Sequence, residues 1–289
     1  MEPPVIASQS IDRKTHAKIS DRLPLRILLT EGVQMNQKVA LQTLAGYGYQ
    51  ADIAKDGKAA IAAVQKQAYD LVFIDVQMPN ISGLESAEII RRDLHIHQPY
   101  IVAMTAHAMQ GNREACLAAG MNDYIQKPIS KQDIFEVLQY FMQLKTAPTV
   151  RDTTAGHSVT SLKRHDRKED SFILVSHSVP TLDTTALEDF SSERSFLIEI
   201  CESFLADAPR RIQDLEAALR QNNHQTLVKT AHALKSLSSC VGAMRLFQLC
   251  QSIEAEAIEG AEIVTSAITA QIATEYHQVQ LAIQDYTNS

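Results

Sequence analysis

The sequence predicts an α/β domain followed by an all-α domain. Between residues 24 and 144, short apolar runs alternate with amphipathic stretches five times, which is the pattern of a parallel sheet with helices on both faces. From residue 183 onward only helical periods occur, and these predict a helical bundle. A chain of 289 residues has room for about two such domains.

The predicted sheet is doubly wound and has five short parallel strands, each followed by a helix. The strands are expected at residues 26–29, 49–54, 70–75, 100–106 and 122–128, and the helices at 36–48, 57–67, 82–93, 108–120 and 131–144. The middle strand contains LVFID, which is apolar on both sides, as expected of a strand covered on both faces. This strand ends on an acid.

The segments outside these patterns predict the domain boundaries. Residues 1–23 are polar and contain prolines, which favours a loose leader, and residues 145–182 are rich in Ser, Thr and charge, which is typical of a linker. The predicted domains are therefore 24–144 and 183–289. Within the second, Pro209 suits the first turn of a new helix, so we expect about five or six helices there.

Composition excludes several classes of protein. The net charge of -7 argues against unspecific nucleic-acid binding, which needs a basic face. No apolar run approaches the roughly 18–20 residues of a membrane-spanning helix, and the first residues lack the apolar core of a signal peptide. The four cysteines show no CxxC spacing, so we expect buried, reduced packing residues in a cytoplasmic protein.

Two carboxylic acids, one hydroxyl and one ammonium lie at or just after the ends of the predicted strands. Ligands of open α/β sheets bind beyond the carboxyl ends of the strands, near the point where strand order reverses. The groups placed there are Glu31, Asp75, Thr105 and Lys127. The combination suits phosphoryl transfer onto Asp75, with Mg²⁺ held by carboxylates and the lysine and hydroxyl holding the remaining phosphoryl oxygens.

The segments FIDVQMPNISGLE, MTAHAM and IQKPIS resemble the receiver domain of two-component response regulators, over about residues 24–144. The resemblance implies a flavodoxin-like fold in which Asp75 is the phosphoacceptor. It further implies that Thr105 is the switch hydroxyl, that Lys127 binds the phosphate, and that Tyr124 is the aromatic residue that moves with Thr105. Glu31, Asp75 and the backbone carbonyl of Gln77 would hold the Mg²⁺.

One position departs from the pattern of that family. The first strand of a receiver normally ends in an acidic pair, whereas this chain has Glu31 followed by Gly32. The site therefore lacks one charge and one inner metal ligand, and we expect Mg²⁺ affinity to fall at least about tenfold, or about 1.4 kcal/mol. Two interpretations stay open: a weakened but phosphorylatable site, and a pseudo-receiver.

The bundle carries a histidine outside its predicted core face. In TLVKTAHALKSLSSCVGA the apolar residues share one arc, and His232 lies about 160° from Leu234, so we expect its imidazole to point into solvent. Lys235 and Ser236 are its neighbours one turn on. An exposed imidazole beside one cation can carry a phosphoryl group for a partner.

The segment AHALKSLSSCVGA resembles the motif AHxLKGSSxxxGA of histidine-containing phosphotransfer (HPt) domains, and the likeness extends over about residues 183–287. The resemblance implies that His232 is the phosphoacceptor and that Lys235 is its supporting cation. Ser236 replaces the usual glycine, which we expect to add a modest steric cost to the approach of a partner.

Together these features predict a two-component phosphorelay protein like the C-terminal part of a hybrid sensor histidine kinase. We find no ATP-binding motif, so the chain is expected to carry phosphoryl groups between a sensor histidine kinase and a separate response regulator. Residues 36–44 would be the docking surface for the bundle within the chain. The alternatives are a non-catalytic interaction module and a phosphatase with Asp75 as nucleophile, although no second acid closely follows Asp75.

Overall fold

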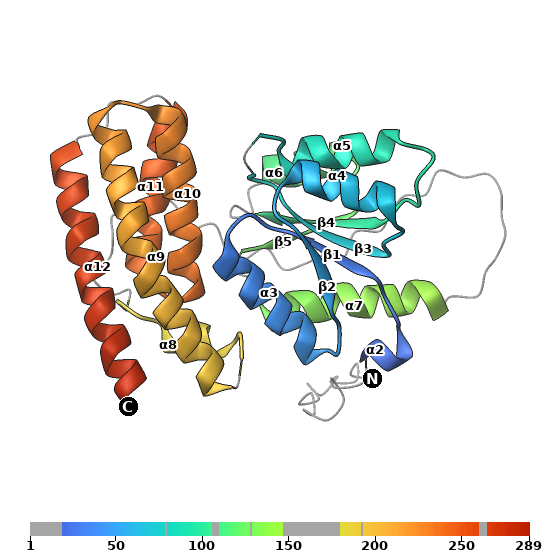
Figure 1. Ribbon diagram of the computed structural model, residues 1–289, viewed down its shortest axis with the longest axis horizontal. Coiled ribbons are helices and arrows are strands. Elements are labelled where there is room, and N and C mark those ends of the chain that lie inside the picture. Colours follow the sequence, from blue (N-terminus) through green and yellow to red (C-terminus); the bar gives the residue numbers. More distant parts are fainter. Residues whose placement is uncertain are drawn as a thin grey trace, which may run out of the picture.

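The computed structural model describes residues 19–78, 80–105, 110–127, 129–146, 180–191, 193–259 and 265–289. It consists of a sheet domain (β1–β5 with α2–α7) and a bundle (α8–α12) that lie side by side (Figure 1). The predicted class, α/β followed by all-α, is therefore confirmed. Most of the predicted leader and linker lies outside the described residues, so the domain boundaries stay a prediction.

The sheet is fully parallel, with the strand order β2-β1-β3-β4-β5. Its strands are β1 (Ile27–Thr30), β2 (Ala51–Ala54), β3 (Leu71–Asp75), β4 (Tyr100–Thr105) and β5 (Asp123–Gln126). The order reverses between β1 and β3, because the chain leaves β1 for one edge and returns on its other side. That reversal opens a crevice at the carboxyl ends of β1 and β3, which is where a ligand site is expected.

Helices cover both faces of the sheet because successive strand residues point to opposite sides. Ile27 and Leu29 face one core, and Leu28 between them faces the other. The first face packs against α2 (Ile19–Arg22), α3 (Gln34–Gly46) and α7 (Lys131–Thr146) (Figure 1). The second packs against α4 (Gly57–Lys66), α5 (Gly83–Arg92) and α6 (Gln110–Ala118).

The end of the predicted leader is ordered, which differs from the expectation of a loose segment. Residues 19–22 form α2, and both Ile19 and Leu23 are buried in the core beneath the sheet. The Tyr49 hydroxyl also donates a hydrogen bond of 2.6 Å to the Leu23 carbonyl oxygen. Two isolated apolar residues in a polar segment give little periodic signal, so the sequence did not indicate this packing.

The bundle consists of α8 (Thr184–Glu188), α9 (Arg194–Arg220), α10 (His224–Cys240), α11 (Met244–Glu259) and α12 (Thr265–Asn288). The predicted helix start at Pro209 is wrong, because this proline lies inside α9, a single helix of 27 residues. Phe204 and Ile212, on either side of Pro209, are buried in the same core. Burial of both turns offsets the backbone hydrogen bond that a proline removes.

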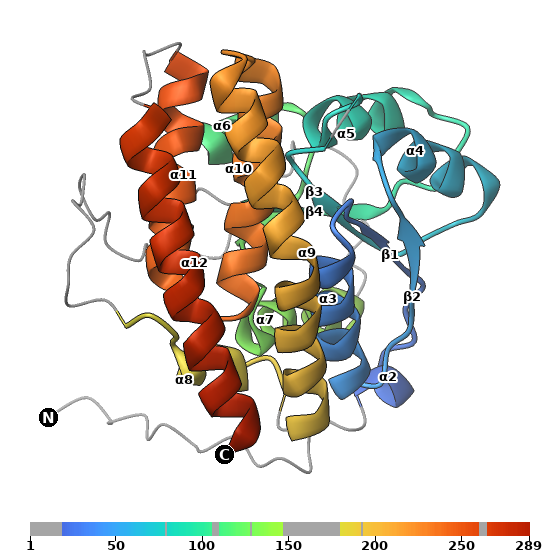
Figure 2. The ribbon, with the colours of Figure 1, turned by 60° about the vertical axis from the view of Figure 1, so that its left-hand side comes forward.

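The bundle docks against α3 of the sheet domain, and α9 and α10 lie next to α3 in both views (Figures 1 and 2). Met35 and Val39 of α3 are buried within the apolar core of the bundle. At the rim, Lys38 forms an ion pair of 2.6 Å with Glu199 of α9. The docking surface thus overlaps the first part of the predicted range 36–44, whereas Ala40 and Leu44 are buried in the core of the sheet domain.

All four cysteines are free and buried, as the sequence predicts. Cys240 lies at the boundary between the two parts, and its thiol donates a hydrogen bond of 3.2 Å to Asn36 Oδ1. Burial raises the pKa of the Cys240 thiol to about 12, which keeps it protonated. Among the described residues, no helix is both long and apolar enough to cross a membrane.

Candidate functional site

The acidic site forms where three strands end at the same edge of the sheet. The parallel register aligns Thr30 with Ile74 and Asp75 with Met104, so the loops after β1, β3 and β5 converge. Lys127, directly after β5, places its Nζ 2.8 Å from Asp75 Oδ2 and 2.5 Å from Glu31 Oε2. All three side chains are buried. The Lys127 side chain therefore joins the side chains of two other residues predicted for this site, Glu31 and Asp75.

The remaining oxygens of the two carboxylates are oriented by backbone amides. The Gln77 amide donates a hydrogen bond of 3.0 Å to Asp75 Oδ1, and the Val33 amide donates one of 2.9 Å to Glu31 Oε1. These bonds leave little rotational freedom to either acid. The predicted metal ligand Gln77 is thus held directly beside Asp75, although its part in metal binding is not tested by this contact.

Thr105 and Tyr124 lie on the two neighbouring strands. Thr105 ends β4 and is buried, and its carbonyl oxygen accepts a hydrogen bond of 2.7 Å from the Lys127 amide. Tyr124, on β5, is half-buried, and the guanidinium of Arg113 lies over its ring at 6.0 Å. Thr105 therefore lies at the carboxyl edge of the sheet, whereas Tyr124 lies two residues before the end of β5. Their predicted roles as a switch pair stay predictions.

The charges of the acidic site do not balance. Two buried carboxylates share one ammonium, which leaves one negative charge in excess when all three are ionised. Burial raises the pKa of Glu31, against the opposing effect of the Lys127 charge, and the Asp75 charge raises it further. Burial alone would lower the pKa of Lys127, but the two acids outweigh it and raise that pKa. The excess charge would be offset by a cation.

The oxygen donors present suit Mg²⁺ in kind but are few. Glu31 and Asp75 are hard carboxylate ligands, and the backbone oxygen of Gln77 is a third donor nearby in sequence. No cluster of three or more acidic, His or Cys side chains able to hold a metal occurs in the part of the chain that the structure describes. Gly32 occupies the position where the resemblance to receiver domains implies a second acid.

Gly32 itself could accept a side chain. Its φ is not in the left-handed region, and a Cβ at this position would lie 3.3 Å from the Lys55 carbonyl oxygen. That distance requires a small shift of one backbone carbonyl. The missing acid is therefore a property of this sequence and not a demand of its backbone.

His232 lies on α10, and the structure contradicts its expected exposure. Only 8% of the residue is exposed. Two features explain the difference. Glu254 of α11 binds the imidazole ring. The sheet domain covers this face of α10, because Ser236 and Ser239, one and two turns after His232, line a cavity together with residues of the sheet domain. Lys235, the predicted supporting cation, is also fully buried.

Glu254 joins the two predicted residues of the bundle. Its Oε1 lies 3.0 Å from His232 Nδ1, and its Oε2 accepts a hydrogen bond from Lys235 Nζ. Burial favours the neutral acid, but the hydrogen bond from His232 and the charge of Lys235 outweigh it and lower the pKa of Glu254 to about 2. Burial lowers the pKa of Lys235 more than Glu254 raises it.

These contacts define which imidazole nitrogen can react. Glu254 is ionised at neutral pH and can only accept, so His232 Nδ1 carries the ring proton. The other nitrogen, Nε2, has no hydrogen-bond partner among the described residues. In the neutral imidazole this nitrogen carries the lone pair, and a positioned lone pair is suited to accept an electrophilic phosphoryl group.

Sequence reasoning missed Glu254, although the sequence contains a signal for it. Cys250, Ile253 and Ala257 recur at helical spacing and face the core, so an acid at position 254 falls on the buried side of the same helix. A buried acid needs a partner, and a lysine and a histidine three residues apart on the neighbouring helix provide one.

Comparisons with known proteins agree with both predicted domains. Residues 27–139 match the family model of the response regulator receiver domain, and residues 199–282 match that of the Hpt domain. The signal transduction histidine-protein kinase BarA of Escherichia coli is 27% identical over 240 residues, which cover 83% of this chain and 24% of BarA. The aerobic respiration control sensor protein ArcB of E. coli is 28% identical over 80% of this chain and 28% of ArcB.

The chain thus spans about a quarter of the length of these curated relatives. Among solved structures, the receiver domain of a sensor histidine kinase from Pseudomonas aeruginosa, with magnesium in its active-site cleft, is 36% identical. That match covers 41% of this chain and 97% of the other, with a TM-score of 0.38.

We predict that Glu254→Gln lowers the free energy of unfolding by about 3 kcal/mol at pH 7, because it leaves Lys235 buried without its counter-ion. The folded-state pKa of Glu254 is about 2, below its ordinary 4.5. Its stabilising contribution is therefore complete above pH 4.5 and is lost as the pH falls toward 2. Denaturant titrations across this range should show the two proteins converging at low pH.

Glu256→Gln is the matched control, since this acid lies on the same helix but is partly exposed. We expect it to change stability by less than about 0.5 kcal/mol. A Glu254→Gln protein as stable as the parent at pH 7 would show that the contacts of Glu254 with His232 and Lys235 contribute nothing to the fold.

Proposed function

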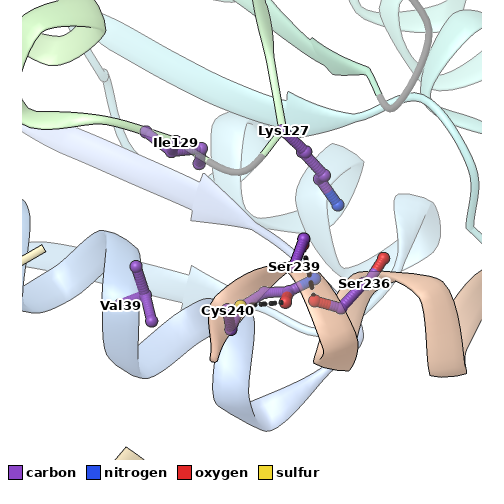
Figure 3. Close-up of a pocket in the computed structure, with 7 residues that line it drawn as sticks. Val39, Lys127, Ile129, Ser236, Ser239 and Cys240 are labelled. Carbon is purple, nitrogen blue, oxygen red and sulfur yellow. Dashed lines mark hydrogen bonds between the residues drawn. The ribbon is translucent and has the colours of Figure 1, made fainter. Parts of the chain in front are cut away.

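Because the chain joins a response regulator receiver domain to an Hpt domain and is a two-component phosphorelay protein, we propose that it passes a phosphoryl group between Asp75 and His232. One observation carries the proposal. Lys127, which is bound to Asp75, lines the same small cavity as Ser236, which lies one turn from His232 (Figure 3). The acidic site and the histidine face are therefore opposed across one interface.

The roles of the residues are argued from their contacts. Asp75 would carry the phosphoryl group as an acyl phosphate, and Lys127 would neutralise the oxygens of that group. In the transfer step the bond between phosphorus and the Asp75 oxygen breaks and a bond to His232 Nε2 forms, which regenerates the carboxylate. Glu254 keeps the ring proton on Nδ1 and offsets the positive charge that the ring gains.

Phosphoryl transfer demands position and charge more than covalent chemistry. Thr105 and Lys127 would hold the phosphoryl oxygens on the sheet domain, and Lys235 would support the group once it is on His232. Bound Mg²⁺ would supply further neutralisation of the phosphoryl oxygens. Glu31, Asp75 and the Gln77 carbonyl would hold it. Gly32 would weaken that binding, because it replaces the second acid of the pair that begins with Glu31.

The partners we propose are a sensor histidine kinase, which supplies the phosphoryl group, and a separate response regulator, which receives it. We place this exchange in the cytoplasm. A second receiver could reach His232 only when the sheet domain leaves α10, because the docked sheet domain covers that face. Docking within the chain and docking of a partner would therefore exclude one another.

A second function is favoured by the ion pairs of Lys127. This lysine already binds both acids of the site, and Gly32 removes the acid that a metal would use. In this alternative the sheet domain is a pseudo-receiver that is never phosphorylated. It would act as an interaction module that masks His232, and only the histidine, or neither site, would carry phosphoryl groups.

We predict that the full chain, incubated with acetyl phosphate and Mg²⁺, gains the mass of one phosphoryl group on Asp75. Gly32→Asp should need about tenfold less Mg²⁺ for the same labelling, because it restores one carboxylate ligand. Intact mass at a series of Mg²⁺ concentrations measures this, with Asp75→Asn as the unlabelled control. A parent chain that stays unlabelled while Gly32→Asp is labelled would support the pseudo-receiver instead.

We further predict that His232→Gln abolishes the acid-labile, base-stable label that marks a phosphorus–nitrogen bond. His224→Gln is the matched control, because His224 lies on the same helix and is exposed. Both proteins would be incubated with radiolabelled acetyl phosphate and tested for the stability of the label in acid and in base. Persistence of the base-stable label without His232 would contradict its assignment as phosphoacceptor.

A further inference from the structure

A small cavity at the interface contains polar groups that have no partner. It measures ≈ 20 Å³ and lies between α3, α10 and the loop after β5 (Figure 3). Two of its lining residues are Asn36 and Ser236, and both are at least nine-tenths buried. Within the described residues, neither Asn36 Nδ2 nor Ser236 Oγ has a hydrogen-bond partner. Buried donors left in this state are costly and require an explanation.

The serines next to Ser236 on α10 behave differently. Ser238 Oγ donates to the Leu234 carbonyl oxygen at 2.8 Å, and Ser239 Oγ donates to the Ser236 carbonyl oxygen at 2.8 Å. Such bonds to the preceding turn are the usual way in which a helix satisfies a buried serine. Ser236 does not use this solution. Its hydroxyl points instead toward the ammonium of Lys127 across the interface (Figure 3).

The hydrogen-bond donors of the cavity suit a phosphoryl oxygen. Lys127, which already pairs with Glu31 and Asp75, lines the cavity, and Ser236 and Asn36 add two neutral donors. A lysine cannot accept a hydrogen bond, so it cannot satisfy the hydroxyl proton of Ser236 or the amide protons of Asn36. The volume is enough for about one water molecule or one phosphoryl oxygen.

We propose that Ser236 donates a hydrogen bond to a phosphoryl oxygen during transfer between Asp75 and His232, with Asn36 as a second donor to the same oxygen. This inference rests on the proposed function and adds residues to it. The serine that replaces the customary glycine is then a catalytic contact and not an obstacle. Ser236 neither gains nor loses a proton; the electron pair of His232 Nε2 replaces the Asp75 oxygen on phosphorus.

The position of Ser236 suits this role on both sides. It follows His232 by one helical turn on the same face of α10, and it shares the cavity with Lys127, whose Nζ lies 2.8 Å from Asp75 Oδ2. In a loose transition state the negative charge lies on the three equatorial oxygens, so hydrogen-bond donors to any of these oxygens stabilise it. Asn36 is held for this by its Oδ1, which accepts from the Cys240 thiol.

The test compares the parent chain with Ser236→Ala and with Ser238→Ala, a buried serine whose hydroxyl is already satisfied. Asp75 is loaded with acetyl phosphate and Mg²⁺, the donor is removed, and the arrival of base-stable label at His232 is followed by rapid quenching. The first-order rate constant does not depend on how much protein is loaded. We expect Ser236→Ala to transfer about tenfold more slowly and Ser238→Ala to transfer like the parent.

A second measurement separates chemistry from docking. Lys38 and Glu199 are 2.6 Å apart, so a zero-length carbodiimide should cross-link the docked domains. We expect the same cross-link yield in all three proteins. Asn36→Ala should also slow transfer, and the Ser236→Ala, Asn36→Ala double variant should lose less than the product of the two single effects if both donors serve one oxygen.

Each outcome decides the proposal. Equal or faster transfer by Ser236→Ala, at equal cross-link yield, would overturn it and show that the serine only obstructs. Slower transfer with a matching fall in cross-linking would also overturn it, because Ser236 would then act through docking. If the parent chain loads Asp75 but never labels His232, the proposed function fails and not this inference alone.

Discussion

The arrangement of the molecule depends on one buried ammonium. Lys127 reaches both Glu31 and Asp75, and these three residues lie at the ends of three different strands. A buried charge without a partner is far more costly than a lost surface contact, so each of the three loops is constrained by the other two. The same constraint presents Lys127 at the edge of the sheet domain, where α10 packs. The acidic site and the docking surface are consequently built from the same residue.

The bundle uses a complementary arrangement of charges. In the sheet domain two acids share one cation, whereas in the bundle one acid, Glu254, binds a cation and an imidazole. The first site has an excess of negative charge that a cation can offset. In the second the Glu254 carboxylate contacts the Lys235 ammonium, and His232 Nε2 has no hydrogen-bond partner among the described residues. In the proposed transfer each site would serve a different stage, and the docked interface would bring the two sites together.

Local periodicity was enough to predict the sheet and most of its acidic site. Alternating apolar runs placed the five strands, and the strand ends placed Glu31, Asp75 and Lys127 at one site, because parallel strands end at the same edge. Periodicity failed at positions whose burial or pairing depends on contacts between segments that are distant in the sequence. It indicated the core face of α10 but not what covers the other face, so His232 was expected in solvent and is buried. Pro209 favours the start of a helix locally, but burial of the turns on both sides of it keeps α9 continuous. Glu254 was missed because its role depends on a pairing between two helices.

The central claim is that Asp75 and His232 exchange a phosphoryl group within one docked chain. The most direct measurement is the rate at which label moves from Asp75 to His232 at protein concentrations that differ by about a hundredfold. Transfer inside the chain is first order, so the account predicts a rate constant that does not change with concentration. It further predicts that a mixture of Asp75→Asn and His232→Gln chains transfers more slowly than the parent and in proportion to concentration. A parent rate that rises with concentration would show transfer between molecules and contradict the account.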